Sequence, residues 1–180
     1  LTFGRTPEGR PLLAFVAFCL VSSAVYLLND IRDVEEDRLH PKKRFRPIAA
    51  GELSPNVAVV MAVVCLAASL ALAFWTSVGL GIVIAFYFVL QLAYSLFLKH
   101  QPILDLAVVA AGFLLRALAG AEATRIFASQ WFLLVAAFGS LFMVAGKRYS
   151  EMVALGAEAG TRKSLEEYSA SYLRFEWMLS

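Results

Sequence analysis

The chain has 180 residues, of which 60% are hydrophobic and only 17% are charged. Soluble domains are typically about half apolar and about one-quarter charged, so this composition, with a mean hydropathy of +0.70, indicates a membrane protein. The net charge of +2 provides no broad basic surface of the kind that binds nucleic acid, and we expect no nucleic-acid partner.

Five apolar stretches are each long enough to cross the hydrocarbon core of a bilayer, and a sixth begins near residue 169. The five cover residues 11–28, 56–75, 79–98, 103–121 and 129–146. Backbone groups in lipid must be hydrogen-bonded within their own segment, so the sequence predicts an all-α, polytopic transmembrane helix bundle. Ser54 as an N-cap, followed by Pro55, is expected to begin the second span, and Pro102 is expected to begin the fourth.

We expect one transmembrane domain over residues 1–180. The chain starts at Leu1 rather than at a methionine, and its last residues follow a helical pattern, so we expect it to be part of a longer protein. Basic residues concentrate in the connections at 29–54, 99–102 and 147–168, which the positive-inside rule places in the cytoplasm. Arg5 and Arg10 fall on the opposite side and argue weakly against this orientation.

The first connection opens with the acidic stretch "NDIRDVEED". Asn29, Asp33 and Asp37 are spaced four residues apart, and Asp30 precedes Asp33 by three, so a continuing helix places them on one side. Carboxylates stacked in this way repel one another unless a cation lies between them, and Mg²⁺ is the hard cation that suits a few carboxylates and substrate phosphates. The alternative is a solvated, purely structural extension of the helix. Glu35 and Glu36 are expected to be solvated in either case.

A basic stretch follows at once, formed by Lys42, Lys43, Arg44 and Arg46. Basic side chains beside a metal-binding acidic cluster suit a diphosphate ligand, because one arginine can bind two phosphate oxygens at once. Taken alone, the bases are also compatible with contact to anionic lipid headgroups. Pro41 and Pro47 are expected to stiffen this loop, and Gly51 to permit a tight turn. Acids and bases together favour a phosphate and metal site at the membrane surface.

The stretch "NDIRDVEEDRLHPKKRFRPIAAG" resembles the first signature of the UbiA superfamily of intramembrane prenyltransferases, N-D-x-x-D-x-x-x-D followed by R-P-x-x-x-G. The resemblance implies a bundle of transmembrane helices with a polar cap over a central cavity. It also implies Mg²⁺ held by Asn29, Asp30, Asp33 and Asp37, with the three aspartates as the catalytic residues. Lys43, Arg44 and Arg46 would then bind the diphosphate of the substrate.

The second acidic signature of that family is absent from the connection at 147–168, which opens with "GKRYSE" instead. Four residues here are candidates for substrate binding: Lys147, Arg148, Tyr149 and Glu151. With "QLAYSLFLKH" and "RKSLEEYSASYLRF", this segment resembles the phosphoribosyltransferase branch of the superfamily. That branch implies transfer of 5-phosphoribose from phosphoribosyl pyrophosphate (PRPP) to a polyprenyl phosphate, with release of pyrophosphate.

The same resemblance implies an enzyme of the plasma membrane with its active site facing the cytoplasm, supplying arabinan precursors of the cell envelope. Its partners would be the two substrates and the lipid bilayer, and formation of a homo-oligomer is left open. The alternative is a prenyltransferase of the same fold, which moves a prenyl chain from a prenyl diphosphate to an aromatic acceptor. A non-catalytic transporter is disfavoured because the sequence shows no internal repeat.

Several further polar residues have simpler interpretations. Lys99 at a helix end and Arg116 within a span are candidates for contact with an anionic substrate, and pairing of Arg116 with another helix is an equal alternative. Asp105 lies near the end of its span and is interpreted as solvated. His40 is interpreted as incidental to the loop in which it lies.

Overall fold

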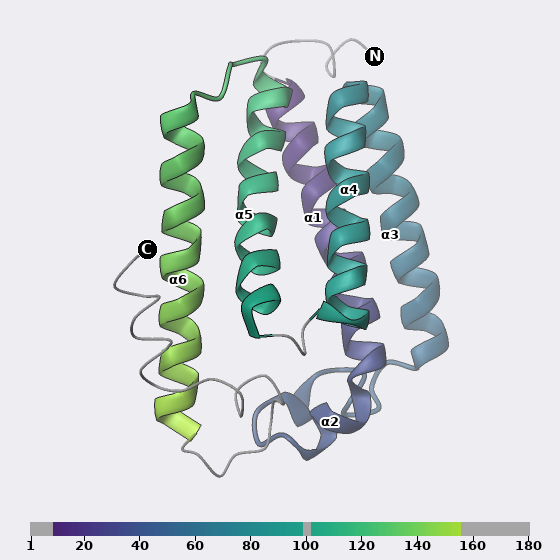
Figure 1. The fold of residues 1–180 in the computed structure, drawn as a ribbon. Helices are drawn as coiled ribbons and strands as arrows, with labels where there is room; N and C mark the ends of the chain where they lie inside the picture. Colours follow the sequence, from purple (N-terminus) through teal and green to yellow (C-terminus); the bar gives the residue numbers. More distant parts are fainter. Residues whose placement is uncertain (1–8, 99–101, 156–180) are drawn as a thin grey trace. The chain divides into compact units, whose positions relative to one another are not determined.

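The computed structural model describes residues 9–98 and 102–155, except for the side chains of 102, 103, 148 and 151–155. Within these residues every regular element is helical (Figure 1). The elements are α1 (Gly9–Arg32), α2 (Val34–Leu39), the 3₁₀ turn η2 (Lys43–Phe45), α3 (Pro55–Thr76), α4 (Val78–Leu96), α5 (Pro102–Thr124) and α6 (Gln130–Leu155).

All five predicted full spans are confirmed as helices, and the differences lie at their ends. The predicted start of α3 is confirmed, because Ser54 Oγ accepts a hydrogen bond from Val57 N at 3.4 Å and Pro55 takes the first helical position. Two helices run past their apolar stretches, α1 to Arg32 and α6 to Leu155. A helix can continue beyond the membrane into polar sequence, so hydropathy does not fix where such a helix ends. The predicted sixth span lies outside the described residues.

Five of the described helices are long and apolar enough to cross a membrane, which indicates a multi-pass membrane protein. Large apolar side chains also cover the outer surface of α3. Val57, Val60, Val63, Val64 and Trp75 are among the exposed ones. A surface of this kind is unfavourable in water and is explained by contact with lipid.

The chain divides into two compact units, and each is described by itself. The first comprises Leu1–Phe88 with Glu122–Arg125, and the second comprises Val89–Ala121 with Ile126–Ser180. The acidic and basic residues of the first connection therefore belong to the first unit, whereas the "GKRYSE" segment belongs to the second.

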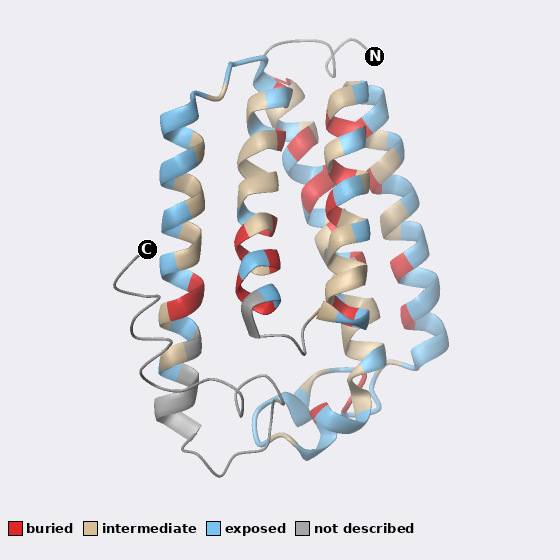
Figure 2. Cartoon of the chain, viewed as in Figure 1, coloured by how far each residue is buried: buried red, intermediate tan, exposed pale blue. Residues whose placement is uncertain are grey.

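In the first unit α1 packs along α3 through small residues, whose buried positions appear in red in Figure 2. The buried side chains include Ala14, Ala17, Val21 and Ala24 on α1, and Ala58, Ala62, Ser69 and Ala73 on α3. Small residues let two helix backbones approach closely, which is the usual basis of helix association in membranes. Ser69 Oγ donates a hydrogen bond to Ala17 O at 2.7 Å and links the two helices within this buried interface.

Contacts at other levels of α1 also hold it in place. Arg10 Nη2 donates to Thr76 O at 3.0 Å, at the end of α1 remote from the acidic stretch. The rings of Phe18 and Tyr87 pack edge to face with their centroids 5.2 Å apart, which joins α1 to α4. α1, whose last turns carry Asn29 and Asp30, is thus held by contacts at several levels.

The second unit contains a partly buried polar contact between α4 and α5. Tyr94 Oη donates a hydrogen bond to Asp105 Oδ1 at 2.5 Å, and the neighbouring Ser95 is also buried. Asp105 is 0% exposed, so its interpretation as a solvated residue is wrong. Tyr94, which donates the hydrogen bond to this carboxyl, lies on a different helix, so helical spacing in the sequence does not predict the contact.

Candidate functional site

The acidic stretch continues the register of α1 into α2. Asp33 N donates to Asn29 O at 2.9 Å, and Asp37 N donates to Asp33 O at 2.8 Å. These bonds carry the helical spacing across the short interruption at Asp33, where α1 has ended and α2 has yet to begin. The predicted spacing of Asn29, Asp33 and Asp37 is therefore confirmed at the level of the backbone.

Arg46 joins two of these aspartates. Its Nη1 lies 2.7 Å from Asp30 Oδ1 and 2.9 Å from Asp37 Oδ2, so one nitrogen is shared by two carboxylates. The side chain of Asp37 is only 3% exposed, whereas that of Arg46 is 37% exposed. Lys43 Nζ lies 3.8 Å from Asp37 Oδ1 and adds a second, longer ion pair. The structure thus brings Asp30, Asp37, Lys43 and Arg46 together.

Backbone hydrogen bonds in the loop after α2 hold Arg46 next to the acidic residues. Pro47 O accepts hydrogen bonds from Glu52 N at 2.9 Å and Leu53 N at 3.0 Å, which closes the loop at its base. Arg38 Nε donates to Ala49 O at 3.3 Å, and Ile48 is buried. Arg46 is therefore held at the start of a closed and partly buried turn.

Gly51 completes this turn with a φ of +82°, and nothing lies within 4 Å of the position that a Cβ would take. Strain in the backbone, rather than a clash, therefore opposes a side chain here. We expect Gly51→Ala to lower the free energy of unfolding by about 1–2 kcal/mol, and Gly51→Asn by less, because asparagine adopts left-handed conformations more readily. Thermal unfolding of the detergent-solubilised protein measures both. Equal unfolding temperatures for wild type and Gly51→Ala would contradict this account.

His40 has a structural role in the loop, which its interpretation as incidental did not anticipate. Its Nδ1 accepts hydrogen bonds from Lys42 N at 3.1 Å and Lys43 N at 3.2 Å, so the imidazole must be neutral at this nitrogen. Burial, reinforced by the positive charge of Lys43, lowers the pKa of His40 below its ordinary value of 6.5. Both the hydrogen bonds and the charge environment favour the neutral ring.

The pH dependence of this turn follows from the lowered pKa. A neutral His40 stabilises the folded loop fully above the unfolded-state pKa of 6.5, and this stabilisation is lost as the pH falls through the lower folded-state pKa. We expect amide exchange at Lys42 and Lys43, corrected for intrinsic rates, to accelerate on acidification below that value. His40→Asn keeps an acceptor that does not titrate and should remove the dependence. Acceleration of equal size in His40→Asn would show that His40 is not responsible.

The remaining predicted bases of the loop are exposed. Arg44 lies over the ring of Phe45, with its guanidinium carbon 4.8 Å from the ring centroid. This contact orients Arg44 on the solvent side of η2 and leaves it accessible to an anion. Lys99 lies outside the described residues.

The carboxylates of the first unit bear on whether this site can hold Mg²⁺. In the described part of the chain, no three side chains of aspartate, glutamate, histidine or cysteine converge as a metal-binding group. Two carboxylates, Asp30 and Asp37, do converge on one positively charged nitrogen. Mg²⁺ in phosphate-transferring sites is commonly held by one or two carboxylates together with substrate oxygens and waters. The residues therefore fit a Mg²⁺ shared with a phosphate-bearing substrate, and the wider four-residue ligand set stays a prediction.

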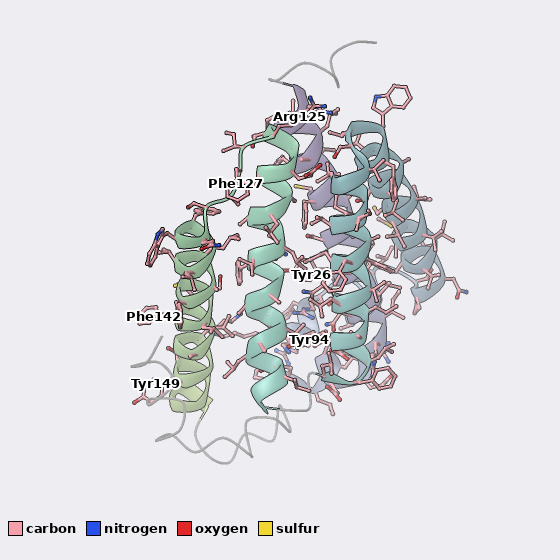
Figure 3. All side chains as sticks on the ribbon, turned by 45° about the horizontal axis from the view of Figure 1, so that its top comes forward. Tyr26, Tyr94, Arg125, Phe127, Phe142 and Tyr149 are labelled. Carbon is pink, nitrogen blue, oxygen red and sulfur yellow. The ribbon has the colours of Figure 1, made fainter. Side chains whose placement is uncertain are left out.

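The second predicted group lies on α6 rather than in a loop. Because α6 runs to Leu155, residues 147–151 are helical, and the expected start of a connection at 147 is wrong. Lys147 is exposed and Tyr149 is partly buried; Figure 3 shows Tyr149 toward the end of α6 that lies away from Phe127. The side chains of Arg148 and Glu151 lie outside the description.

Arg116 makes contacts within its own helix. Its Nη1 donates to Gly112 O at 2.8 Å, and its guanidinium carbon lies 5.6 Å from the ring centroid of Phe113. An arginine within a span needs such partners, because a bare charge in lipid is costly. Its candidacy for substrate contact stays a prediction.

Comparison with known proteins gives concordant results. The profile of the UbiA prenyltransferase family matches residues 2–154. The decaprenyl-phosphate phosphoribosyltransferase of Mycolicibacterium smegmatis is 56% identical over 169 residues, covering 93% of this chain and 53% of the relative. Proteins of the same name are 54% identical in Mycobacterium tuberculosis H37Rv and 55% identical in Corynebacterium glutamicum, each over 93% of this chain and over 56% and 52% of the relative. The chain thus spans about half the length of the curated relatives it matches.

Proposed function

This chain belongs to the UbiA prenyltransferase family, and we propose that it carries the diphosphate-binding part of a phosphoribosyltransferase. The proposed reaction transfers 5-phosphoribose from PRPP to a polyprenyl phosphate such as decaprenyl phosphate, and releases pyrophosphate. The observation that carries the proposal is the convergence of Asp30, Asp37 and Arg46, with Lys43 beside them. The names of the relatives support a polyprenyl phosphate as the acceptor and a phosphoribosyl group as the group that is transferred.

The proposed chemistry requires charge stabilisation more than proton transfer. A phosphate oxygen of the lipid, already anionic at neutral pH, forms a bond to the anomeric carbon of the ribose. The bond from that carbon to the pyrophosphate oxygen breaks, and the pyrophosphate leaves with the electron pair. No strong general base is needed for a nucleophile of this kind.

The residues of the first unit suit the departing group. Arg46 and Lys43 stand next to the acids and are exposed enough to reach phosphate oxygens, and Arg44 lies on the solvent side of the same turn. Asn29, Asp30, Asp33 and Asp37 would hold Mg²⁺, which supplies positive charge to the leaving pyrophosphate when bound. Asp37 is nearly buried by its contacts with Arg46 and Lys43, so its carboxylate is fixed in position.

The sequence also predicts cations for the other phosphate. Lys147, with Arg148 beside it in sequence, would bind the 5-phosphate of the donor or the phosphate of the lipid. Tyr149 and Glu151 would contact ribose hydroxyls or orient those cations, and Lys99 and Arg116 are retained as further contacts to the anionic substrates. We propose a location in the plasma membrane with the site facing the cytoplasm, where the product serves as a precursor of cell-envelope arabinan.

The proposal is tested by incubating the full-length protein with labelled PRPP and decaprenyl phosphate, and by measuring lipid-linked phosphoribose in an organic extract. We expect the product to form with Mg²⁺, to disappear on chelation with EDTA, and to return when Mg²⁺ is restored. Product formation at an unchanged rate in EDTA would contradict the metal assignment. The absence of any lipid-linked phosphoribose in all conditions would contradict the reaction itself.

A further inference from the structure

Arg46 occupies a position that a bridging cation would otherwise take. A single nitrogen of its guanidinium lies 2.7 Å from Asp30 Oδ1 and 2.9 Å from Asp37 Oδ2. The two carboxylates come from different helices, α1 and α2, and the arginine comes from the loop that follows η2. Two acids from separate elements are therefore bridged by one internal cation, and Lys43 adds a longer contact to Asp37 at 3.8 Å (the loop and α2 lie beyond the end of α1 in Figure 1).

The two sides of this contact differ in their freedom to move. The side chain of Asp37 is 3% exposed and that of Asp30 is 23% exposed, whereas Arg46 is 37% exposed and ends a long flexible stem. Arginine also carries five N–H donors in a planar fork that matches phosphate oxygens. The carboxylates are thus the fixed partners, and the guanidinium is the partner that can be exchanged.

We propose that Arg46 is an exchangeable counter-ion, which competes with a divalent cation for Asp30 and Asp37 until a diphosphate binds the guanidinium. This inference rests on the proposed function, in which these acids hold Mg²⁺. A ligand that removes a competitor must strengthen binding at the vacated site, and linkage makes the effect reciprocal. The metal and the diphosphate therefore bind together with positive coupling, and the metal binds weakly alone. Such coupling favours loading of the metal with the diphosphate donor.

The test measures binding rather than activity, with Mn²⁺ as the probe and the full-length protein in detergent. Free Mn²⁺ is quantified by electron paramagnetic resonance in the absence of any phosphate. Arg46→Gln is expected to bind Mn²⁺ about tenfold or more tightly than wild type, because the charged competitor is removed. Arg46→Met is a second neutral replacement that keeps the apolar stem, and the same gain is expected.

Arg38→Gln serves as the matched control. Arg38 lies on α2 beside Asp37 in sequence, but its guanidinium pairs with Glu35 at 2.9 Å and donates to Ala49 O. The substitution removes the same charge from the same region, and glutamine retains a donor for Ala49 O. We expect the affinity for Mn²⁺ alone to stay within about twofold of wild type, because an exposed charge acts weakly at a distance.

A second arm measures equilibrium binding of labelled inorganic pyrophosphate at saturating Mn²⁺, corrected for the complex that the two form in solution. Wild type is expected to bind pyrophosphate, and Arg46→Gln to bind it about tenfold or more weakly.

If wild type binds pyrophosphate with Mn²⁺ but neither neutral variant gains affinity for Mn²⁺ alone, the exchange is wrong and the proposed function stands. An equal gain in Arg38→Gln would likewise overturn direct competition. If wild type binds no Mn²⁺ with or without pyrophosphate, the metal assignment and this inference both fail.

Discussion

Replacing Asp33 with alanine is expected to abolish phosphoribosyl transfer, by about 100-fold or more, while the helices stay folded. Asp33 precedes α2 but does not cap it through its side chain, so the substitution removes no helix cap. Asp33 lies between Asn29 and Asp37 in the helical register, where the proposed metal needs an oxygen ligand. Initial rates with labelled PRPP, beside thermal unfolding of the same preparation, measure both effects.

Glu36→Ala is the control for this result. Glu36 is an exposed acid of α2, three residues after Asp33, and lies outside the proposed ligand set, so its removal changes the charge equally. We expect it to keep activity near that of wild type. If Asp33→Ala were as active as Glu36→Ala, the assignment of Asp33 to the metal would be wrong.

The second large effect is expected at Asp37, where stability and activity should fall together. Its nearly buried carboxylate holds both Arg46 and Lys43, and its loss leaves two cations with one fewer partner. We expect Asp37→Ala to lower the free energy of unfolding by about 1–3 kcal/mol. A value near the lower end of this range is expected, because Arg46 is partly exposed and solvent screens its ion pair. Limited proteolysis after the bases of residues 42–46 should also accelerate.

Asp37→Asn separates the two contributions. Asparagine keeps an oxygen that accepts a hydrogen bond from Arg46 but carries no charge, so we expect most of the stability to return and the activity to stay lost. Thermal unfolding and initial rates on the two variants test this. Full activity in Asp37→Asn would show that the carboxylate charge is not required, and would contradict its proposed role as a metal ligand.

The spans could be predicted from the sequence because a bilayer demands a minimum length of apolar residues, and each of the five stretches meets it. Their ends were harder to predict. The continuation of α1 to Arg32 and of α6 to Leu155 takes place in polar sequence, where hydropathy carries no signal. This difference matters for Lys147, which lies on a helix instead of opening a loop.

The acidic and basic groups of the candidate site could also be predicted, but their pairing could not. Helical spacing relates Asn29, Asp33 and Asp37 to one another because all follow one helical path. The contact of Asp30 and Asp37 with Arg46 depends on the return of the loop through Pro47 and Gly51. The sequence indicated this contact only through the presence of opposite charges in the same connection.

Contacts with side chains on other helices likewise could not be predicted from the sequence. Asp105 was misinterpreted because its position near a helix end suggested water, whereas Tyr94 of α4 satisfies its carboxyl in a buried setting. A buried carboxyl in a span requires a donor, and a tyrosine eleven residues earlier was one available candidate. The role of His40 in the turn was missed for a related reason, since its ring bonds to backbone groups that no sequence pattern specifies.

We propose that the diphosphate site serves PRPP rather than a prenyl diphosphate. The most direct measurement supplies the full-length protein, in Mg²⁺, with labelled PRPP and decaprenyl phosphate in one reaction, and with a labelled prenyl diphosphate and an aromatic acceptor in another. We predict that lipid-linked phosphoribose accumulates in the first reaction and that the second gives no product. Turnover of the prenyl diphosphate without any lipid-linked phosphoribose would contradict the account.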